Sequence, residues 1–140
     1  INGKNSEFHA AMGLCNLPYV KDIIKARKYV CELYDELLEE SVLMRPDIPR
    51  ETEINYAYYP IVYKSEETLI SVKDRMNENE IYPRRYFYPP LDALPYISRK
   101  TSKVTDDISS RIMCLPLYSQ LQHKDILDIV KIINMYSEKD

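Results

Sequence analysis

The chain has 140 residues, a length that corresponds to one domain with a hydrophobic core of its own. Its formal net charge is −3 and both signs are interspersed, so it offers no broad basic surface to nucleic acid. It contains no run of about 18 apolar residues and no leader-like segment, which argues against a membrane partner and favours the cytoplasm.

The N-terminal stretch predicts a helix that is rich in small residues. A polar turn containing Gly3 and Asn5 precedes Ser6, which is a good N-cap, and the helix is expected to run to about Leu17. Pro18 then marks a break or the first turn of a new helix. Small side chains on a helix indicate that another part of the structure comes close to it.

A second helix is expected to extend to near Ser41, because apolar residues recur at spacings of three and four between Ile23 and Leu38. The residues that follow, 43–53, read as a loop. Pro46 and Pro49 each remove a helical donor and favour extended geometry in the residue before them.

The middle of the chain predicts a strand and a third helix. Residues 54–63 are dense in aromatic and β-branched side chains, and Pro60 favours an edge position or a bulge. Ser65 is an N-cap for a helix over residues 66–80, with carboxylates in its first turn. The apolar stripe of this helix consists of Leu69, Val72 and Met76.

Residues 81–97 read as an extended stretch that becomes a proline-stiffened loop, and residues 105–113 as a short helix that leads into extended chain. The last helix covers residues 124–136. Its apolar face consists of Ile126, Ile129, Val130 and Ile133. This order predicts an α+β fold with a small antiparallel or mixed sheet covered on one side by helices.

Few residues in the sequence predict catalysis within this chain. His9 and His123 have no partner at metal-ligand spacing, and no serine or cysteine lies in a nucleophile context, so no catalytic residue and no metal site is expected. The densest chemical surface is the run from Arg84 to Tyr88, where two guanidiniums stand beside aromatic rings and could hold a phosphate. The alternative interpretation is that Arg84 is exposed to solvent and that the aromatic side chains of this run belong to the hydrophobic core. Asn5, just before a helix N-terminus, could contact an anion.

Six short motifs in this order resemble one family. They are GKN, SEFHAAMGL, the helix LPYVKDIIKARKYVCELYDEL, the stretch NYAYYPIVY, the loop RRYFYPPLDALPYI, and SSRIMCLPLY followed by KDILDIVKII. Together they resemble the C-terminal part of the DegT/DnrJ/EryC1/StrS aminotransferases. These are fold type I pyridoxal-phosphate (PLP) enzymes that aminate keto-sugars attached to nucleoside diphosphates, in amino-sugar biosynthesis for cell-surface polysaccharides or natural products.

The resemblance implies that residues 1–140 are a single C-terminal small domain, a fragment without the large domain that carries the cofactor lysine. The full-length enzyme would use pyridoxal phosphate, a nucleotide-sugar substrate and glutamate, and would form a homodimer. The fragment alone would be inactive and would hold no cofactor. The small-residue helix would then lie near the dimer interface.

The resemblance also implies roles for five residues. Asn5 would contact the cofactor phosphate of the other subunit, and Arg27 would contact the substrate pyrophosphate. Arg85, Tyr86 and Tyr88 would line the sugar pocket.

A hypothesis from another class is an independent α+β module that binds a nucleotide or a peptide through Arg84, Arg85 and the nearby tyrosines. An RNA-binding sheet is disfavoured by the acidic balance and by the lack of a glycine-aromatic recognition pattern. A coding sequence that precedes this one, has the length typical of the family and encodes the cofactor lysine would favour the aminotransferase hypothesis.

Overall fold

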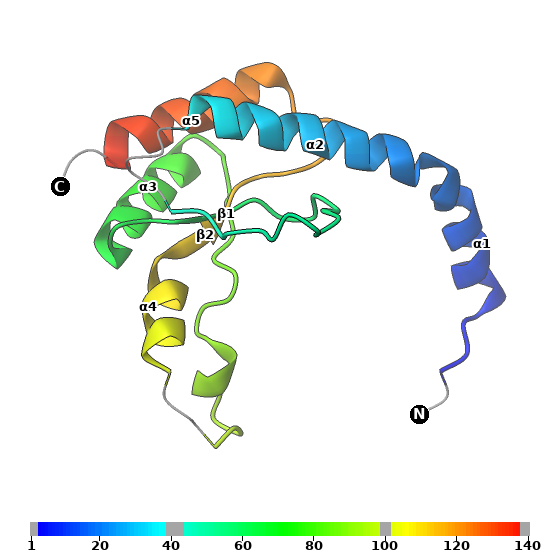
Figure 1. Cartoon of the computed structure of the whole chain (residues 1–140), viewed down its shortest axis with the longest axis horizontal. Coiled ribbons are helices and arrows are strands. Elements are labelled where there is room, and N and C mark those ends of the chain that lie inside the picture. The colour runs from blue at the N-terminus through cyan, green and yellow to red at the C-terminus, as the bar shows by residue number, and fades with distance from the viewer. Residues whose placement is uncertain (1–2, 39–43, 99–101, 138–140) are drawn as a thin grey trace.

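A computed structural model describes residues 3–38, 44–98 and 102–137 of the chain, and it has the expected α+β architecture (Figure 1). The elements in order are α1 (Glu7–Asn16), the 3-10 turn η1 (Leu17–Tyr19), α2 (Val20–Leu37), β1 (Pro60–Val62), α3 (Glu66–Glu78), the 3-10 turn η2 (Leu91–Ala93), α4 (Lys103–Arg111), β2 (Ile112–Cys114) and α5 (His123–Ser137). Within these ranges no helix is both long and apolar enough to cross a bilayer.

The sheet is small and antiparallel. Strand β1 pairs with β2 so that Ile61 lies opposite Met113. Single bridges extend the pairing on both sides, from Met44 to Val62 and from Arg84 to Cys114. The segment that begins at Arg84 is thereby placed along the edge of β2.

The prediction of a strand over residues 54–63 is wrong for most of its length, because only Pro60–Val62 forms a strand. Two local features explain the difference. The side chain of Asn55 accepts a hydrogen bond from the Ala57 amide at 3.1 Å, and Tyr56 has a φ of 51°, in the left-handed region. A strand cannot continue through such a turn, so the aromatic pattern here does not report strand pairing.

Helices α2, α3 and α5 pack together and, with the sheet, enclose the core. Their apolar stripes are those that the sequence predicts. The fully buried large side chains are Tyr34, Tyr59, Ile61, Tyr63, Leu69, Val72, Met76, Met113, Ile126, Ile129 and Ile133. Val130, the remaining member of the expected face of α5, is also buried.

The helix boundaries agree closely with the predicted caps. Ser6 and Ser65 cap α1 and α3, each accepting a hydrogen bond from the backbone amide three residues later. Helix α4 starts at Lys103, two residues before the prediction, because Ser102 is its N-cap. Helix α2 ends at Leu37, and the expected end near Ser41 lies outside the described residues.

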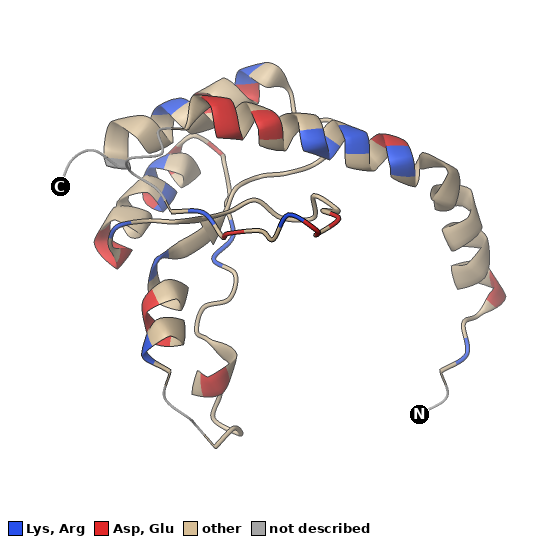
Figure 2. Cartoon of the chain, viewed as in Figure 1, with Lys and Arg blue, Asp and Glu red and all other residues tan. Residues whose placement is uncertain are grey.

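Helix α1 stands apart from the core. In Figure 1 it continues beyond the N-terminal end of α2, away from the sheet, and none of its residues is buried. Phe8 is 88% exposed, and nothing lies within 4 Å of a Cβ built at Gly13. Figure 2 shows that α1 is almost free of charged residues. Within the described chain, no segment therefore comes close to the small-residue helix in the way that the sequence predicts.

An exposed helix with a single acidic residue, Glu7, should drive association of the chain with itself. Burying Phe8 and Met12, one turn apart on α1, would contribute about 1.5–3 kcal/mol each. The double variant Phe8→Ala/Met12→Ala should weaken self-association at least about tenfold in sedimentation or light scattering. The matched control is Leu127→Ala/Met135→Ala, which removes two exposed apolar side chains from α5. A monomer at high concentration, or an equal effect of the control, would contradict the prediction.

Candidate functional site

The run from Arg84 to Tyr88 lies at the edge of the sheet, and β2 fixes its backbone. The Arg84 amide donates to the Cys114 carbonyl at 3.2 Å, and the Cys114 amide donates to the Arg84 carbonyl at 2.8 Å. Because neighbouring residues in extended chain point to opposite sides, Arg84 and Arg85 enter different surroundings.

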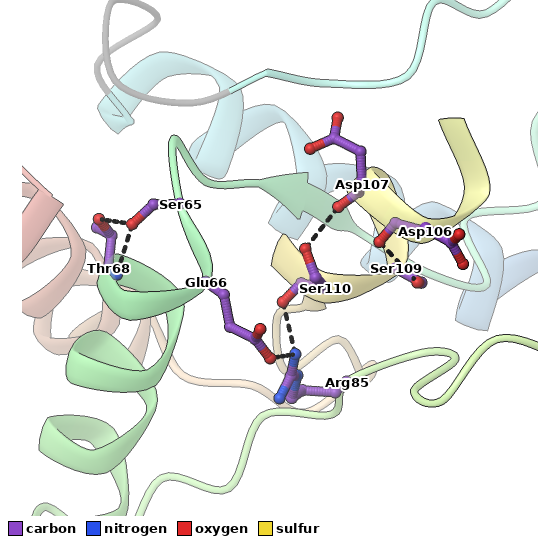
Figure 3. A network of polar contacts seen from close by, with 8 residues as sticks. All are labelled: Ser65, Glu66, Thr68, Arg85, Asp106, Asp107, Ser109 and Ser110. Atoms are coloured by element: carbon purple, nitrogen blue, oxygen red, sulfur yellow. Dashed lines mark hydrogen bonds and ion pairs between the residues drawn. The ribbon is translucent and has the colours of Figure 1, made fainter. Parts of the chain in front are cut away.

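Arg85 is held between two helices and an aromatic ring. Its Nη2 donates to Glu66 Oε1 at 2.8 Å and to the Ser110 carbonyl at 2.5 Å (Figure 3). Its guanidinium carbon lies 3.8 Å from the centre of the Tyr88 ring, a close cation–π contact. The Arg85 side chain is 17% exposed. These contacts join the first turn of α3, the last turn of α4 and the loop.

The same guanidinium keeps one donor unused. Arg85 Nε is buried and has no hydrogen-bond partner among the described residues. A buried donor without a partner is uncommon, because it loses its water without a replacement bond. Arg85 therefore has a hydrogen-bond donor left over while Glu66 and Ser110 hold its Nη2.

A second arginine supports the end of α4 next to this site. Arg111 donates to both carboxylate oxygens of Asp107, from Nε at 2.9 Å and from Nη2 at 2.7 Å. Its Nη1 donates to the Tyr63 carbonyl at 2.6 Å. The hydrogen bond from Arg111 lowers the pKa of the Asp107 carboxyl below its ordinary value. The ion pair between Arg111 and Asp107, next to Ser110, therefore stays formed at neutral pH.

Tyr86 lies on the other side of the loop, in an aromatic group. Its hydroxyl accepts a hydrogen bond from Arg84 Nη1 at 2.8 Å, and its ring meets those of Tyr58 and Phe87 edge-on at 5.2 and 5.0 Å. Tyr86 is half-buried, whereas Tyr58 and Phe87 are exposed. The two tyrosines expected to line a sugar pocket are thus both near Arg85 in sequence, but only Tyr88 touches its guanidinium.

Two of the five predicted residues lie elsewhere. Arg27 is half-buried on α2, and its Nε, like that of Arg85, is buried and has no partner among the described residues. Asn5 is exposed directly before α1. Figure 1 shows the start of α1 well separated from the loop after residue 81. Within one chain, Arg85 and Tyr88 come together, and Asn5 does not join them.

Sequence reasoning missed the partners of Arg85. Glu66 was expected only as a carboxylate that favours the start of a helix, and Ser110 contributes its carbonyl, for which its side-chain type gives no signal. The pairing of Arg85 with Glu66 spans 19 residues, and the one with Ser110 spans 25. No periodicity or local motif reports such contacts.

The cysteines offer no reactive nucleophile within the core. Burial raises the pKa of the Cys31 thiol to about 11 and raises that of Cys114 above its ordinary value. Both are therefore protonated near neutral pH. Over the described ranges, no group of three histidine, cysteine or acidic residues is placed to hold a metal ion.

A model of the DegT/DnrJ/EryC1/StrS aminotransferase family matches residues 1–134. The chain belongs to this family.

Known members of the family are similar to almost all of the chain. A dTDP-4-amino-4,6-dideoxy-D-glucose transaminase of Escherichia coli is 29% identical over 143 residues, which cover 95% of this chain. The match covers 38% of the E. coli enzyme, so the chain spans well under half the length of this relative. The alternative of an independent binding module has no support in these similarities.

Solved structures share the fold at low sequence identity. PseC of Helicobacter pylori, an aminotransferase involved in the biosynthesis of pseudoaminic acid, superposes with a TM-score of 0.84 at 14% identity, over 100% of this chain and 39% of that one. Spr1654 of Streptococcus pneumoniae, described as a sugar aminotransferase and solved in its PLP form, gives 0.79 at 20% identity, over 96% and 36% of the two chains.

Enzymes of this family depend on pyridoxal phosphate. Every described lysine is exposed except Lys73, whose Nζ lies 3.7 Å from Asp74 at the surface. A cofactor-bearing lysine needs a site that excludes water and orients the amine.

Proposed function

We propose that this chain acts as the C-terminal part of a PLP-dependent aminotransferase that transfers an amino group from glutamate to a keto-sugar linked to a nucleoside diphosphate. The observation that carries the proposal is the family match over residues 1–134, in a chain that spans 38% of the E. coli relative. The large domain of the same protein would supply the lysine. When bound, the cofactor supplies the electron sink for amino transfer.

The role of this chain would be to bind and orient the substrate. Among the described residues, neither the buried Nε of Arg27 nor that of Arg85 has a hydrogen-bond partner, and the two phosphates of a nucleotide sugar are acceptors for such donors. We assign Arg27 to the pyrophosphate, and Arg85 to the sugar pocket with Tyr86 and Tyr88. The contacts of Arg85 to Glu66 and Ser110 would fix the position of its remaining donors.

The subunits would pair as a homodimer through the face that carries α1. Support comes from the exposed apolar residues of α1 and from its position away from the core (Figure 1). In such a dimer, Asn5 at the start of α1 would reach the cofactor phosphate of the partner subunit. The exposure of Asn5 leaves its side chain free for that contact.

The chain alone should not bind pyridoxal phosphate covalently at one site. Its exposed lysines lie in water, where no pocket orients the amine. After incubation with the cofactor and borohydride reduction, mass spectrometry should find at most scattered, substoichiometric labelling. Full labelling of a single lysine would contradict the prediction.

The gene tests the assignment of the chain as one part of a longer enzyme. The proposal expects the coding sequence upstream of residue 1 to continue in the same frame with a large domain that contains the cofactor lysine. A stop codon directly upstream, with no partner protein that carries such a domain, would contradict it.

A further inference from the structure

A cavity of about 720 Å³ lies between the C-terminal end of α3, the residues 79–82 that follow it, and α5. We call it the helix cavity. In Figure 1, α3 and the C-terminal end of α5 lie at the opposite end of the molecule from α1. The volume falls within the range of small-molecule sites. None of the residues assigned above to the substrate or the cofactor lines the helix cavity, so the proposed function gives it no role.

Three carboxylates line the helix cavity. Asp125 and Asp128 are three residues apart on α5, which places them on one face of the helix, and Glu80 comes from the segment after α3. All three side chains are exposed, and none of them forms an ion pair within the described chain. A cavity lined by charges of one sign concentrates ions of the opposite sign, which here are cations.

Two basic residues also line the cavity, but one of them is already neutralised. Arg75 Nη1 lies 2.7 Å from Glu78 Oε2, and Glu78 is not among the residues that line the cavity. The other basic residue, Lys131, forms no ion pair in the part of the chain that the structure describes. The helix cavity therefore sets three unpaired carboxylates against one unpaired ammonium group.

Local structure explains only one of the three carboxylates. Asp125 lies in the first turn of α5, where the helix dipole favours an acidic side chain. Asp128 lies beyond that turn. Glu80 has a φ of 61°, in the left-handed region that glycine or asparagine normally occupies after a helix. The helix dipole and the turn therefore give no reason for a carboxylate at position 80 or 128.

Tyrosine rings form another part of the cavity wall. Tyr118 and Tyr82 are 45% and 71% exposed, and Tyr136 is half-buried. The guanidinium carbon of Arg75 lies 5.7 Å from the centre of the Tyr136 ring, so one ring of the cavity already contacts a cation. Tyr82 and Tyr118 are exposed enough to contact another one.

The arrangement of the carboxylates indicates the form of the ligand. Among the residues that the structure describes, no three acidic side chains converge to hold a metal ion. The carboxylates of the helix cavity instead come from two different elements. A ligand that pairs with more than one of them therefore needs several positive charges spread along a chain.

We propose that the helix cavity binds a linear polyamine, an aliphatic chain that carries two or more ammonium groups. The ammonium groups pair with Glu80, Asp125 and Asp128, and the methylene groups between them pack on the rings of Tyr82 and Tyr118. The inference goes beyond the proposed function, because no residue of the proposed substrate site takes part in it.

Calorimetry and 15N-resolved NMR on the 140-residue chain at low salt test the proposal with three probes. Spermidine carries several ammonium groups on one chain, butylamine carries a single one, and magnesium chloride supplies a compact divalent ion. Spermidine should bind with a Kd of about 1 mM or tighter and should shift the amides of Glu80, Tyr118 and Asp128. Butylamine and magnesium should bind at least about tenfold more weakly. No binding of spermidine, or equal binding of magnesium at the same amides, would overturn the proposal.

Variants locate the binding. Glu80→Gln/Asp128→Asn should weaken spermidine binding about tenfold, and Tyr118→Ala about threefold, because each removes part of the contact with the ligand. Asp47→Asn/Glu51→Gln is the matched control, since it removes the same two charges from exposed positions that do not line the cavity. The control should change the affinity less than about twofold. Unchanged affinity in Glu80→Gln/Asp128→Asn, or equal weakening by the control, would show that spermidine responds only to net charge and would overturn the proposal.

Discussion

In the full-length protein, replacing Arg85 by alanine should raise KM for the nucleotide-linked sugar about ten- to a hundredfold. A charge-assisted hydrogen bond to a phosphate or sugar oxygen is worth about 1.5–3 kcal/mol, and about 1.4 kcal/mol corresponds to a factor of ten. Arg85 would make such a bond through its buried Nε, which has no partner in the part of the chain that the structure describes. The half-reaction with glutamate, which involves no nucleotide sugar, should change little. Steady-state kinetics of both half-reactions measure the effect.

Two further variants separate binding by Arg85 from its structural contacts. Glu66→Gln removes the ion pair with Arg85 but keeps the arginine, so it should raise KM much less than Arg85→Ala. Arg75→Ala is a matched control, since Arg75 is an exposed arginine that is ion-paired with Glu78 and does not contact Arg85, and it should have no effect on KM. Equal losses in the two half-reactions, or equal effects of Glu66→Gln and Arg85→Ala, would identify a purely structural arginine.

Truncating Leu69 to alanine should lower the free energy of unfolding of the chain by about 2–5 kcal/mol. Leu69 is fully buried on α3 within the core, so the change removes packed methyl groups and leaves a cavity. For a domain of this size, such a loss is a large share of the total stability. Urea unfolding followed by circular dichroism measures it.

The neighbouring residue is the control. Ile70 lies on the same helix and is 42% exposed, so Ile70→Ala should change the unfolding free energy by less than about 1 kcal/mol. If the two substitutions had equal effects, α3 would not pack in the way that the structure shows.

Sequence patterns predicted the helices well and the strands poorly. The helices α3 and α5 have strong local signals, because an N-cap serine or a repeat of apolar residues at three and four specifies each one. The strands have only three residues each. The prediction of a longer strand rested on the aromatic content of residues 54–63. In the structure, the turn at Asn55 and Tyr56 keeps the strand from starting earlier.

The sequence points to the residue types of the candidate site but not to the contacts that they make. The run from Arg84 to Tyr88 does gather cations and rings at one edge of the sheet. The pairing of Arg85 with Glu66 depends on how α3 and α4 pack, which no local pattern encodes. The separate surroundings of Arg84 follow from strand alternation, but the cavity that Arg84 lines is formed by three segments that are distant in sequence.

We propose above that this chain works as part of a sugar-nucleotide aminotransferase. The most direct measurement is mass spectrometry of a dTDP-linked 4-keto-6-deoxy sugar incubated with glutamate, pyridoxal phosphate and the full-length protein. We expect the full-length protein to form the corresponding amino sugar nucleotide together with 2-oxoglutarate. We expect no product from the 140-residue chain alone. Absence of amino transfer to any nucleotide-linked keto-sugar by the full-length protein, with cofactor bound, would contradict it.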